Sequence, residues 1–434
     1  MKYLKTSDPR FYSKLKRFAS GATDRTALRE VVAGILEDVR RRGDKAVLDY
    51  GERFDGFRCR PSELRVDPAD LKEAEKALSP GERGQIREAI RCVRDFHRKG
   101  LPRNWTSRNP QGALVGERWY PIERVGIYIP AGNVPLVSTA VMTTTLARLA
   151  GVPSMAVFTP AKGDGVVSPQ MLAGLSLCGV TEVYRIGGAQ AIAAMAYGTR
   201  TIPPVGKVMG PGNAYVAEAQ RQVFGDVGVD LLPGPSEAMG IADETARPDY
   251  LAADLLAQAE HGSGKERIYF IYLDEAQAAA VEAAVAEMLP GLKHEAVIRR
   301  IWKTRTAFIQ ARNLEEAIEV ANFIAPEHLE LHVAKKHYTR LVREIRTAGA
   351  ILCGHETPTV LGDFTAGPSH TLPTSRTGRF FSGLKITDFM RRSSVVEYDR
   401  KSLTKAREVV RVFAKLEDLD AHGQSMEVRF KAEN

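Results

Sequence analysis

The stretch Val125-Gly126-Ile127-Tyr128-Ile129-Pro130 decides how the fold of this chain is interpreted, because it is a short apolar run bounded by turn residues. Two more runs of the same kind follow it, at 154–158 and 182–186. Helical patterns lie in the intervening sequence, at 139–150 and 190–197. Strands that alternate with helices of this length predict right-handed crossovers and a parallel sheet.

The same alternation continues toward the carboxyl terminus. A helical pattern over 248–261 is closed by Gly262, a common helix stop. An aromatic strand at 268–273 and an alanine-rich helix at 275–288 follow it, and a further strand is expected at 350–353. We therefore predict an α/β protein with two Rossmann-like parallel-sheet domains, neither of which carries the G-x-G-x-x-G fingerprint.

The two ends of the chain differ from this pattern. Residues 1–25 look like an irregular polar arm, and a helix capped by Thr23-Asp24 follows it and stops at Gly43. The carboxyl-terminal residues form a predicted helical appendage with a β-like end at 426–430. The resulting segments are an N-terminal arm (1–25), a discontinuous α/β domain (26–127 and 238–384), an α/β domain inserted into it (128–237) and a C-terminal tail (385–434).

Composition places the chain among globular proteins. Its 434 residues include four cysteines, which lie far apart and form no C-x-x-C pair. This usage favours a reducing, cytoplasmic compartment. We expect no secretory signal and no membrane partner, since no stretch reaches roughly 18 uninterrupted apolar residues. The net charge of +8 is dispersed along the chain, so it indicates a solvated surface rather than nucleic-acid binding.

Three segments carry polar side chains that are candidates for a functional site. Gln258 and His261 are three residues apart on an expected helix and share one face, although a polar last turn is the simpler alternative. Asp363 lies in a Gly- and Pro-rich connection after a strand, where an ordinary turn is equally expected. His422 lies in the tail, where a surface histidine is the simpler interpretation.

A neighbouring acid and imidazole, Glu327 and His328, stand in the segment Ala325-Pro326-Glu327-His328-Leu329. A proline at the first helical position followed by an acid is an ordinary helix start, which is one interpretation. The other interpretation is catalytic, because neighbouring side chains point in different directions and can serve two separate proton transfers.

Three glycine-rich turns would let a phosphate or a ribose approach the backbone closely. They are Pro130-Ala131-Gly132-Asn133, Ile186-Gly187-Gly188-Ala189-Gln190 and Met209-Gly210-Pro211-Gly212-Asn213. Their spacing alone does not establish a dinucleotide site.

Taken in order, these segments resemble the histidinol dehydrogenase family. The match covers nearly the whole chain, and its motifs, each weak alone, follow one another as they do in the family. The matching segments are 125–130, 186–191, Gly210-Pro211-Gly212-Asn213, Gly234-Pro235-Ser236-Glu237, 254–262, 325–329, Gly362-Asp363 and Ala421-His422.

The resemblance implies a full set of site residues and partners. It implies zinc bound by Gln258, His261, Asp363 and His422. It implies a domain-swapped homodimer, because in this family the C-terminal histidine reaches into the partner subunit. It implies that Glu327 and His328 are the catalytic bases. Substrate contacts are implied for Ser236, Gln258, His261, His328, Asp363, Glu417 and His422, and NAD contacts for Tyr128, Gln190 and Asn213.

The implied reaction is the four-electron oxidation of L-histidinol to L-histidine through L-histidinaldehyde, the last steps of histidine biosynthesis. We expect His328 to take the hydroxyl proton in the first oxidation and Glu327 to activate the water that hydrates the aldehyde. The metal would act chiefly as a template for the substrate. The sequence does not distinguish zinc from manganese as the native metal.

Two departures from the family pattern concern the substrate side. Ser369 stands where the family usually has Asn, and Arg376 and Arg379 make the following segment more basic. They leave open a related zinc- and NAD-dependent dehydrogenase that oxidises another small polyol or a sulfonated diol to its acid. A non-catalytic binding protein with the same fold is a further alternative, but the intact Glu327, His328 and candidate ligands speak against it.

Overall fold

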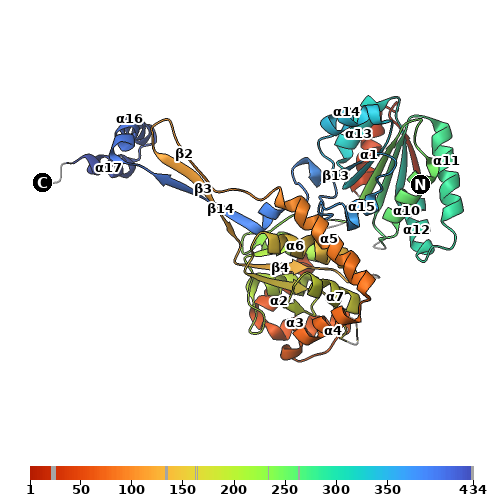
Figure 1. Cartoon of the computed structure of the whole chain (residues 1–434), viewed down its shortest axis with the longest axis horizontal. Coiled ribbons are helices and arrows are strands. Elements are labelled where there is room, and N and C mark those ends of the chain that lie inside the picture. The colour runs from red at the N-terminus through yellow and green to blue at the C-terminus, as the bar shows by residue number, and fades with distance from the viewer. Residues whose placement is uncertain are drawn as a thin grey trace. The chain divides into compact units, whose positions relative to one another are not determined.

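The computed structural model describes residues 1–20, 26–131, 135–161, 163, 165–232, 234–261 and 264–431. The chain forms two compact units, one of residues 1–100 and 122–389 and one of residues 101–121 and 390–434 (Figure 1). The predicted cap Thr23-Asp24, the helix stop Gly262 and the turn residues Gly132 and Asn133 lie outside the described residues. Among the helices of the described ranges, none has the length and hydrophobicity that a membrane crossing requires.

A five-stranded parallel sheet forms one part of the first unit, as the sequence pattern predicts. Its order is β6 (Val183–Tyr184), β5 (Ser154–Phe158), β4 (Arg124–Tyr128), β7 (Lys207–Met209) and β8 (Gly228–Val229). The chain therefore builds outward from β4 in one direction and then returns to build from β7 in the other. Ligands of such sheets bind beyond the carboxyl ends of the strands at this reversal, here next to Tyr128 and Met209.

In the described ranges, eight helices accompany this sheet. One apolar core joins α2 (Thr26–Arg42), α3 (Asp44–Asp55), α8 (Gly188–Tyr197) and α9 (Ala214–Val223) to the strands. The others are α4 (Pro68–Ala77), α5 (Pro80–Arg98), α6 (Val137–Leu149) and α7 (Pro169–Leu177). The packing of α2 and α3 differs from our prediction, which assigned residues 26–127 to the domain of residues 238–384. The apolar stripe of α2 predicts which residues are buried, but not which sheet covers them.

A six-stranded parallel sheet forms the other part of the first unit. Its order is β1 (Lys2–Lys5), β11 (Thr306–Gln310), β10 (Arg267–Tyr272), β9 (Glu237–Ala242), β12 (His328–His332) and β13 (Ala350–Cys353). The prediction of an irregular arm at residues 1–25 was wrong, because β1 pairs with β11 and is followed by α1 (Phe11–Ser20). Phe11, Leu15 and Phe18 recur at helical spacing and are buried in this core.

Helices cover both faces of the six-stranded sheet (Figure 1). Alternate residues of β10 show the two faces, since Tyr269 and Ile271 join the core with α1 while Ile268 and Phe270 join the opposite one. The helices are α10 (Pro248–Ala259), α11 (Glu275–Met288), α12 (Glu295–Arg305), α13 (Leu314–Ile324), α14 (Tyr338–Glu344) and the short α15 (Thr359–Phe364). Single 3₁₀ turns in the first unit are η1 (Pro61–Glu63), η2 (Lys335–His337), η3 (Thr377–Arg379) and η4 (Ile386–Phe389).

Up to residue 431, the second unit combines a three-stranded antiparallel sheet with two helices. The sheet order is β14 (Met390–Glu397), β3 (Leu114–Pro121) and β2 (Trp105–Arg108), and the helices are α16 (Arg400–Leu416) and α17 (Asp420–Glu427). The predicted helical tail is thus correct for α16 and α17 but omits β14. The β-like end expected at 426–430 is wrong, because α17 passes directly into the 3₁₀ turn η5 (Val428–Phe430).

Candidate active site

Glu327 and His328 lie at the amino end of β12. Ala325, with a left-handed φ of 51°, ends α13, and the chain then enters the strand rather than the helix that Pro326 would also allow. Both side chains are buried, at 6% and 4% residual exposure, and Glu327 Oε1 lies 3.9 Å from His328 Nε2. The sequence thus produces a buried acid next to a buried imidazole.

The surroundings of Glu327 make its proton unusually hard to remove. Burial raises its pKa well above the ordinary value, and the nearby carboxylates of Glu237 and Asp363 raise it further. The backbone N–H of Glu237 donates to Glu327 Oε2 at 2.9 Å, and the Ser236 hydroxyl also bonds this carboxyl. Positive charge brought to this position would lower the pKa and free a base.

Three histidines lie close to one another around this acid. Burial lowers the pKa of His328 to about 3, and neighbouring His261 and His370 lower it further. Burial likewise lowers the pKa of His370 to about 4. The imidazoles of His328 and His370 are therefore in the neutral form, which is the form that accepts a proton or binds a metal.

His370 is a site residue that the sequence reasoning did not single out. Its Nδ1 lies 3.0 Å from the backbone oxygen of Asp363, and its Nε2 lies 3.3 Å from Thr139 Oγ1. It therefore connects α15 to α6. The only signal in the sequence was its place in the Gly- and Pro-rich segment after Asp363.

The first unit carries three of the four predicted metal ligands. Gln258, on α10, is 2% exposed, and its amide nitrogen has no hydrogen-bond partner within the described chain. His261 follows the end of α10 and is accessible to solvent. Asp363 lies in α15 and not in a loop as predicted. Burial, then the neighbouring Glu330, raises the pKa of Asp363 to about 7, as expected for a carboxylate without a cation partner.

These donors fit a divalent metal ion. An amide oxygen, an imidazole nitrogen and a carboxylate are donors that zinc accepts. The second unit carries the fourth predicted ligand, His422, on α17, and the predicted substrate contact Glu417 at the end of α16. Both are exposed to solvent. Convergence of all four predicted ligands on one ion stays a prediction.

A buried ion pair anchors the other side of Glu327. Arg267 Nη1 lies 3.2 Å from Glu237 Oε1, and both side chains are below 10% exposure. Glu237 Oε2 also accepts the backbone N–H of Ser375 at 3.0 Å. Glu237, Arg267 and Glu327 all stand at the amino ends of their strands. This part of the site thus lies at the amino edge of the six-stranded sheet. Ligands were expected at its carboxyl edge.

The predicted cofactor residues gather at the carboxyl edge of the five-stranded sheet. The Tyr128 hydroxyl accepts the backbone N–H of Gly188 at 3.2 Å, and burial raises the Tyr128 pKa to about 12. Gln190 is 1% exposed, yet neither of its amide atoms has a partner within the described residues. Asn213 is exposed and caps α9, its Oδ1 accepting the N–H groups of Tyr215 and Val216.

The turn before Asn213 is held in shape by buried side chains. Gly210 donates its N–H to Asp230 Oδ2 at 3.3 Å, and its carbonyl accepts from Gln220 Nε2 at 2.9 Å. Gly210 has a φ of 106°, and a Cβ there would lie 2.2 Å from the Tyr128 carbonyl. The orphaned Gln190 amide and this glycine cradle, at the reversal of the strand order, fit a dinucleotide such as NAD.

One further group of ionisable side chains was missed by the sequence reasoning. Asp254, Glu330 and His332 bring ligand-type atoms within 4.8 Å of one another, the one such group of His, Cys, Asp and Glu in the described part of the chain. The alternation of His328, Glu330 and His332 with leucines had period two and could have indicated a strand with three polar residues on one face.

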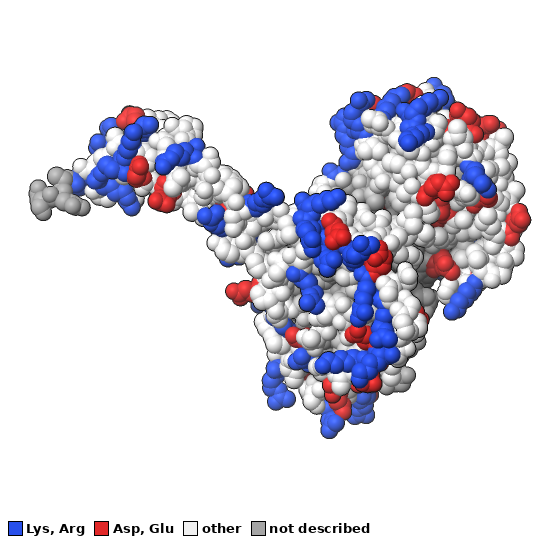
Figure 2. Space-filling view, viewed as in Figure 1, with Lys and Arg blue, Asp and Glu red and all other residues white. Residues whose placement is uncertain are grey.

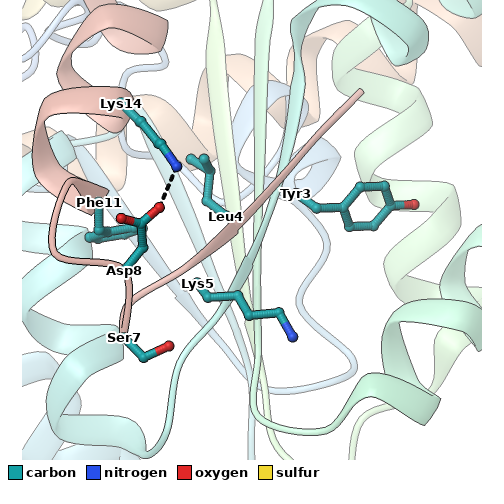
Figure 3. Close-up of a pocket in the computed structure, with 7 residues that line it drawn as sticks. All are labelled: Tyr3, Leu4, Lys5, Ser7, Asp8, Phe11 and Lys14. Atoms are coloured by element: carbon teal, nitrogen blue, oxygen red, sulfur yellow. Dashed lines mark hydrogen bonds and ion pairs between the residues drawn. The ribbon is translucent and has the colours of Figure 1, made fainter.

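The surface of the protein carries a pocket and many charged side chains. A pocket near the amino terminus is lined by Tyr3, Leu4, Lys5, Ser7, Asp8, Phe11 and Lys14, and an ion pair between Lys14 and Asp8 crosses it (Figure 3). It contains none of the predicted residues. On the face drawn in Figure 2, Lys and Arg are interspersed with Asp and Glu rather than gathered in one continuous basic stripe.

Comparisons with known proteins match this chain to histidinol dehydrogenases. The profile of the histidinol dehydrogenase family matches residues 19–430. A histidinol dehydrogenase of Rhizobium meliloti is 43% identical over 92% of this chain and 91% of its own length. One of Gluconobacter oxydans is 41% identical over 99% of this chain and its whole length. The crystal structure of histidinol dehydrogenase from Elizabethkingia anophelis superposes with a TM-score of 0.93 at 30% identity, covering 99% of this chain and 98% of that one.

Proposed function

The chain belongs to the histidinol dehydrogenase family, and we propose that it oxidises L-histidinol to L-histidine through L-histidinaldehyde, with NAD as acceptor and one bound zinc per chain. The observation that carries the proposal is the buried pair of Glu327 and His328, surrounded by neutral imidazoles and carboxylates. Such a site offers two proton acceptors of different chemistry, as two successive oxidations of one carbon require.

His328 is the proton acceptor of the first oxidation. It is buried and neutral, so its nitrogen is able to take the hydroxyl proton as hydride leaves the carbinol carbon. NAD, when bound, supplies the hydride acceptor in both oxidations.

Glu327 is the proton acceptor of the hydration step, in which water adds to the aldehyde. Burial and two neighbouring carboxylates raise its pKa, so positive charge nearby would favour the ionised form that takes a proton. Zinc, when held by Gln258, His261, Asp363 and His422, supplies that charge and a fixed point for the substrate's imidazole and amino groups. Ser236 and the Glu237 N–H orient the Glu327 carboxyl.

The acceptor site is supported by groups that lack partners of their own. Gln190 has two amide atoms without a partner among the described residues, while hydrogen bonds hold Tyr128 against Gly188 and Gly210 against Asp230. Hydrogen bonds from Gln190 and Asn213 to NAD would satisfy the buried amide, whose isolation is otherwise costly.

A homodimer completes the proposed site. Helix α16 exposes a stripe of apolar residues, Val409, Val412, Phe413 and Leu416, at 45–73% of their full areas. Such a stripe marks an interaction surface, and the next residues along the chain are Glu417 and, on α17, His422. We infer that a second copy covers this stripe and that the tails exchange, so that Glu417 and His422 reach the partner's site.

Two arginines that favoured an anionic substrate are engaged within the protein. Arg376 stacks on the Phe323 ring at 4.2 Å and donates from Nε to the Phe323 carbonyl at 2.9 Å. Arg379 donates from Nε to the Arg376 carbonyl at 2.9 Å. These contacts use the Nε donor of each arginine and so weaken the case for a sulfonated diol, while Arg379 stays exposed. The four free cysteines are in keeping with a cytoplasmic location.

The test is to count NADH formed per substrate consumed by the zinc-loaded chain. A four-electron oxidation gives about two NADH per histidinol, because each two-electron step reduces one NAD. A value of one would show that the aldehyde is released, and turnover of a sulfonated diol but not of histidinol would move the chain to the alternative substrate class.

A further inference from the structure

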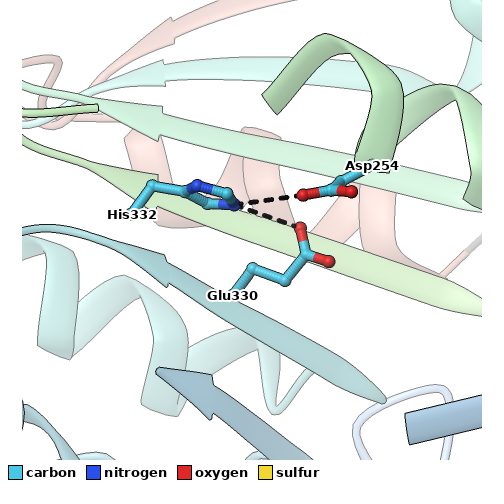
Figure 4. A group of neighbouring side chains, drawn as sticks. All are labelled: Asp254, Glu330 and His332. Carbon is cyan, nitrogen blue, oxygen red and sulfur yellow. Dashed lines mark ion pairs between the residues drawn. The ribbon is translucent and has the colours of Figure 1, made fainter. Parts of the chain in front are cut away.

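The cluster of Asp254, Glu330 and His332 has no role in the proton transfers proposed above. His332 Nε2 lies 3.4 Å from Asp254 Oδ2 and 3.5 Å from Glu330 Oε2, so one imidazole faces two carboxylates (Figure 4). The three side chains are 1%, 11% and 3% exposed, in the order His332, Asp254 and Glu330. A charged imidazole is the arrangement that keeps the two buried carboxylates together.

Each member of the cluster belongs to an element that carries a residue of the proposed site. Asp254 lies on α10, one helical turn before Gln258. Glu330 lies on β12 and shares a face with His328 two residues earlier. The cluster is therefore placed between the helix that carries a metal ligand and the strand that carries the catalytic pair.

Glu330 extends the connection to a third element. Its Oε1 accepts the backbone N–H of Thr359 at 2.7 Å and also the Thr359 hydroxyl. Thr359 is the first residue of α15, whose six residues include Asp363. The cap of this short helix depends on a side chain from β12, because Pro358 before it offers no side-chain hydrogen bond.

We propose that Asp254, Glu330 and His332 are positioning residues that fix α10, β12 and α15 against one another and thereby set the affinity of the metal centre. This inference rests on the proposed function, since it concerns the same metal ligands. The cluster itself binds neither metal nor substrate. Glu330 Oε1 already accepts two hydrogen bonds from Thr359, and the His332 imidazole already faces the carboxylates of Asp254 and Glu330, so the three side chains hold one another without an ion.

The experiment measures zinc affinity by competition with a chromophoric chelator, and zinc stoichiometry by elemental analysis, on the full-length chain. We expect Glu330→Gln and His332→Gln each to weaken zinc binding by up to about 10-fold, the lower end of what loss of a ligand's direct partner does, because both act through the elements that carry the ligands. At most one zinc per chain should bind throughout. With saturating zinc, kcat of both variants should recover.

Two more variants keep the test interpretable. Thr359→Val removes only the hydroxyl donor, so it should fold and weaken zinc binding by about two- to fivefold. Glu182→Gln is the control, because it breaks a partly buried ion pair with Arg124 in the five-stranded sheet, away from the proposed metal ligands. It should lower thermal stability and leave zinc affinity unchanged.

The outcomes separate this inference from the proposed function. Wild-type zinc affinity in Glu330→Gln, His332→Gln and Thr359→Val would overturn the inference, provided that Asp363→Asn loses zinc. Two zinc ions in the wild type and one in Glu330→Gln would also overturn it, by making the cluster a metal site. A wild-type chain that binds no zinc would refute the proposed metal centre itself, and the inference with it.

Discussion

Replacing Glu327 by Gln separates the two proton acceptors of the proposed reaction. The change keeps the size of the side chain, and the amide oxygen is able to accept the Glu237 N–H that now lies 2.9 Å from Oε2. It also removes a carboxyl whose burial near Glu237 and Asp363 opposes its ionisation. The variant should therefore fold and bind both substrates.

The expected loss is confined to the second oxidation. A positioned base contributes about 10²–10⁴ in rate, which corresponds to roughly 3–5 kcal/mol of barrier. Since His328 serves the first oxidation, Glu327→Gln should still form one NADH per histidinol and release the aldehyde. Oxidation of added histidinaldehyde should fall by the full factor.

The assay compares NADH formation from histidinol and from histidinaldehyde at saturating NAD and zinc. Asp44→Asn is the control. This buried carboxylate at the start of α3 accepts a hydrogen bond from the Thr201 hydroxyl at 2.8 Å, and α3 packs with the five-stranded sheet. It should oxidise both substrates at wild-type rates. Equal, undiminished rates from both substrates in Glu327→Gln would refute the role assigned to this residue.

Three further predictions concern the cofactor, the dimer and pH. Gly188→Ala should raise KM for NAD about tenfold, because Gly188 has a φ of 68° and a Cβ there would lie 2.6 Å from Gln190 Oε1. The control Gly112→Ala is also strained but has open space around the added Cβ, so its KM should not change, and similar KM values in the two variants would contradict the prediction. Leu416→Glu should weaken dimerisation at least about tenfold, measured by light scattering, and should reduce activity with it, since Leu416 is 73% exposed in the single chain. The control Phe54→Glu should change neither dimerisation nor activity. An active monomer would disprove tail exchange. His332 is buried against Asp254 and Glu330, with His355 at 6.0 Å; burial opposes its charge, but the two carboxylates raise its pKa to about 9. The charged imidazole stabilises the fold fully below the ordinary pKa of 6.5, and this stabilisation is lost as pH rises through 9. The difference in unfolding free energy between the wild type and His332→Gln should therefore fall by about 3 kcal/mol over this range. A difference that does not change with pH would show that the imidazole is neutral.

Local elements of the fold were predictable because their signals are local. The strands at 154–158 and 350–353 and the helix at 275–288 have the predicted bounds. Pairings between distant segments were not predictable, since no local pattern specifies them. Thus β1 joins β11 across some 300 residues, and β14 joins β3 in the second unit.

Site residues could be predicted where they belong to motifs of the family. They could not be predicted where only the folded chain brings distant residues together. Glu327 and His328 are brought together as neighbours in sequence, while His370 and the cluster around His332 become visible only after folding. Asp363 was placed in a loop because α15 is six residues long and its cap comes from Glu330, which no window around Asp363 contains.

The claim that four distant side chains share one metal ion is tested most directly by anomalous diffraction at the zinc edge from the zinc-loaded homodimer. The account predicts one peak per chain, about 2.0–2.2 Å from donor atoms of Gln258, His261 and Asp363 and from a His422 nitrogen supplied by the second copy. A peak bound instead by Asp254, Glu330 and His332, or a His422 far from any peak, would contradict it.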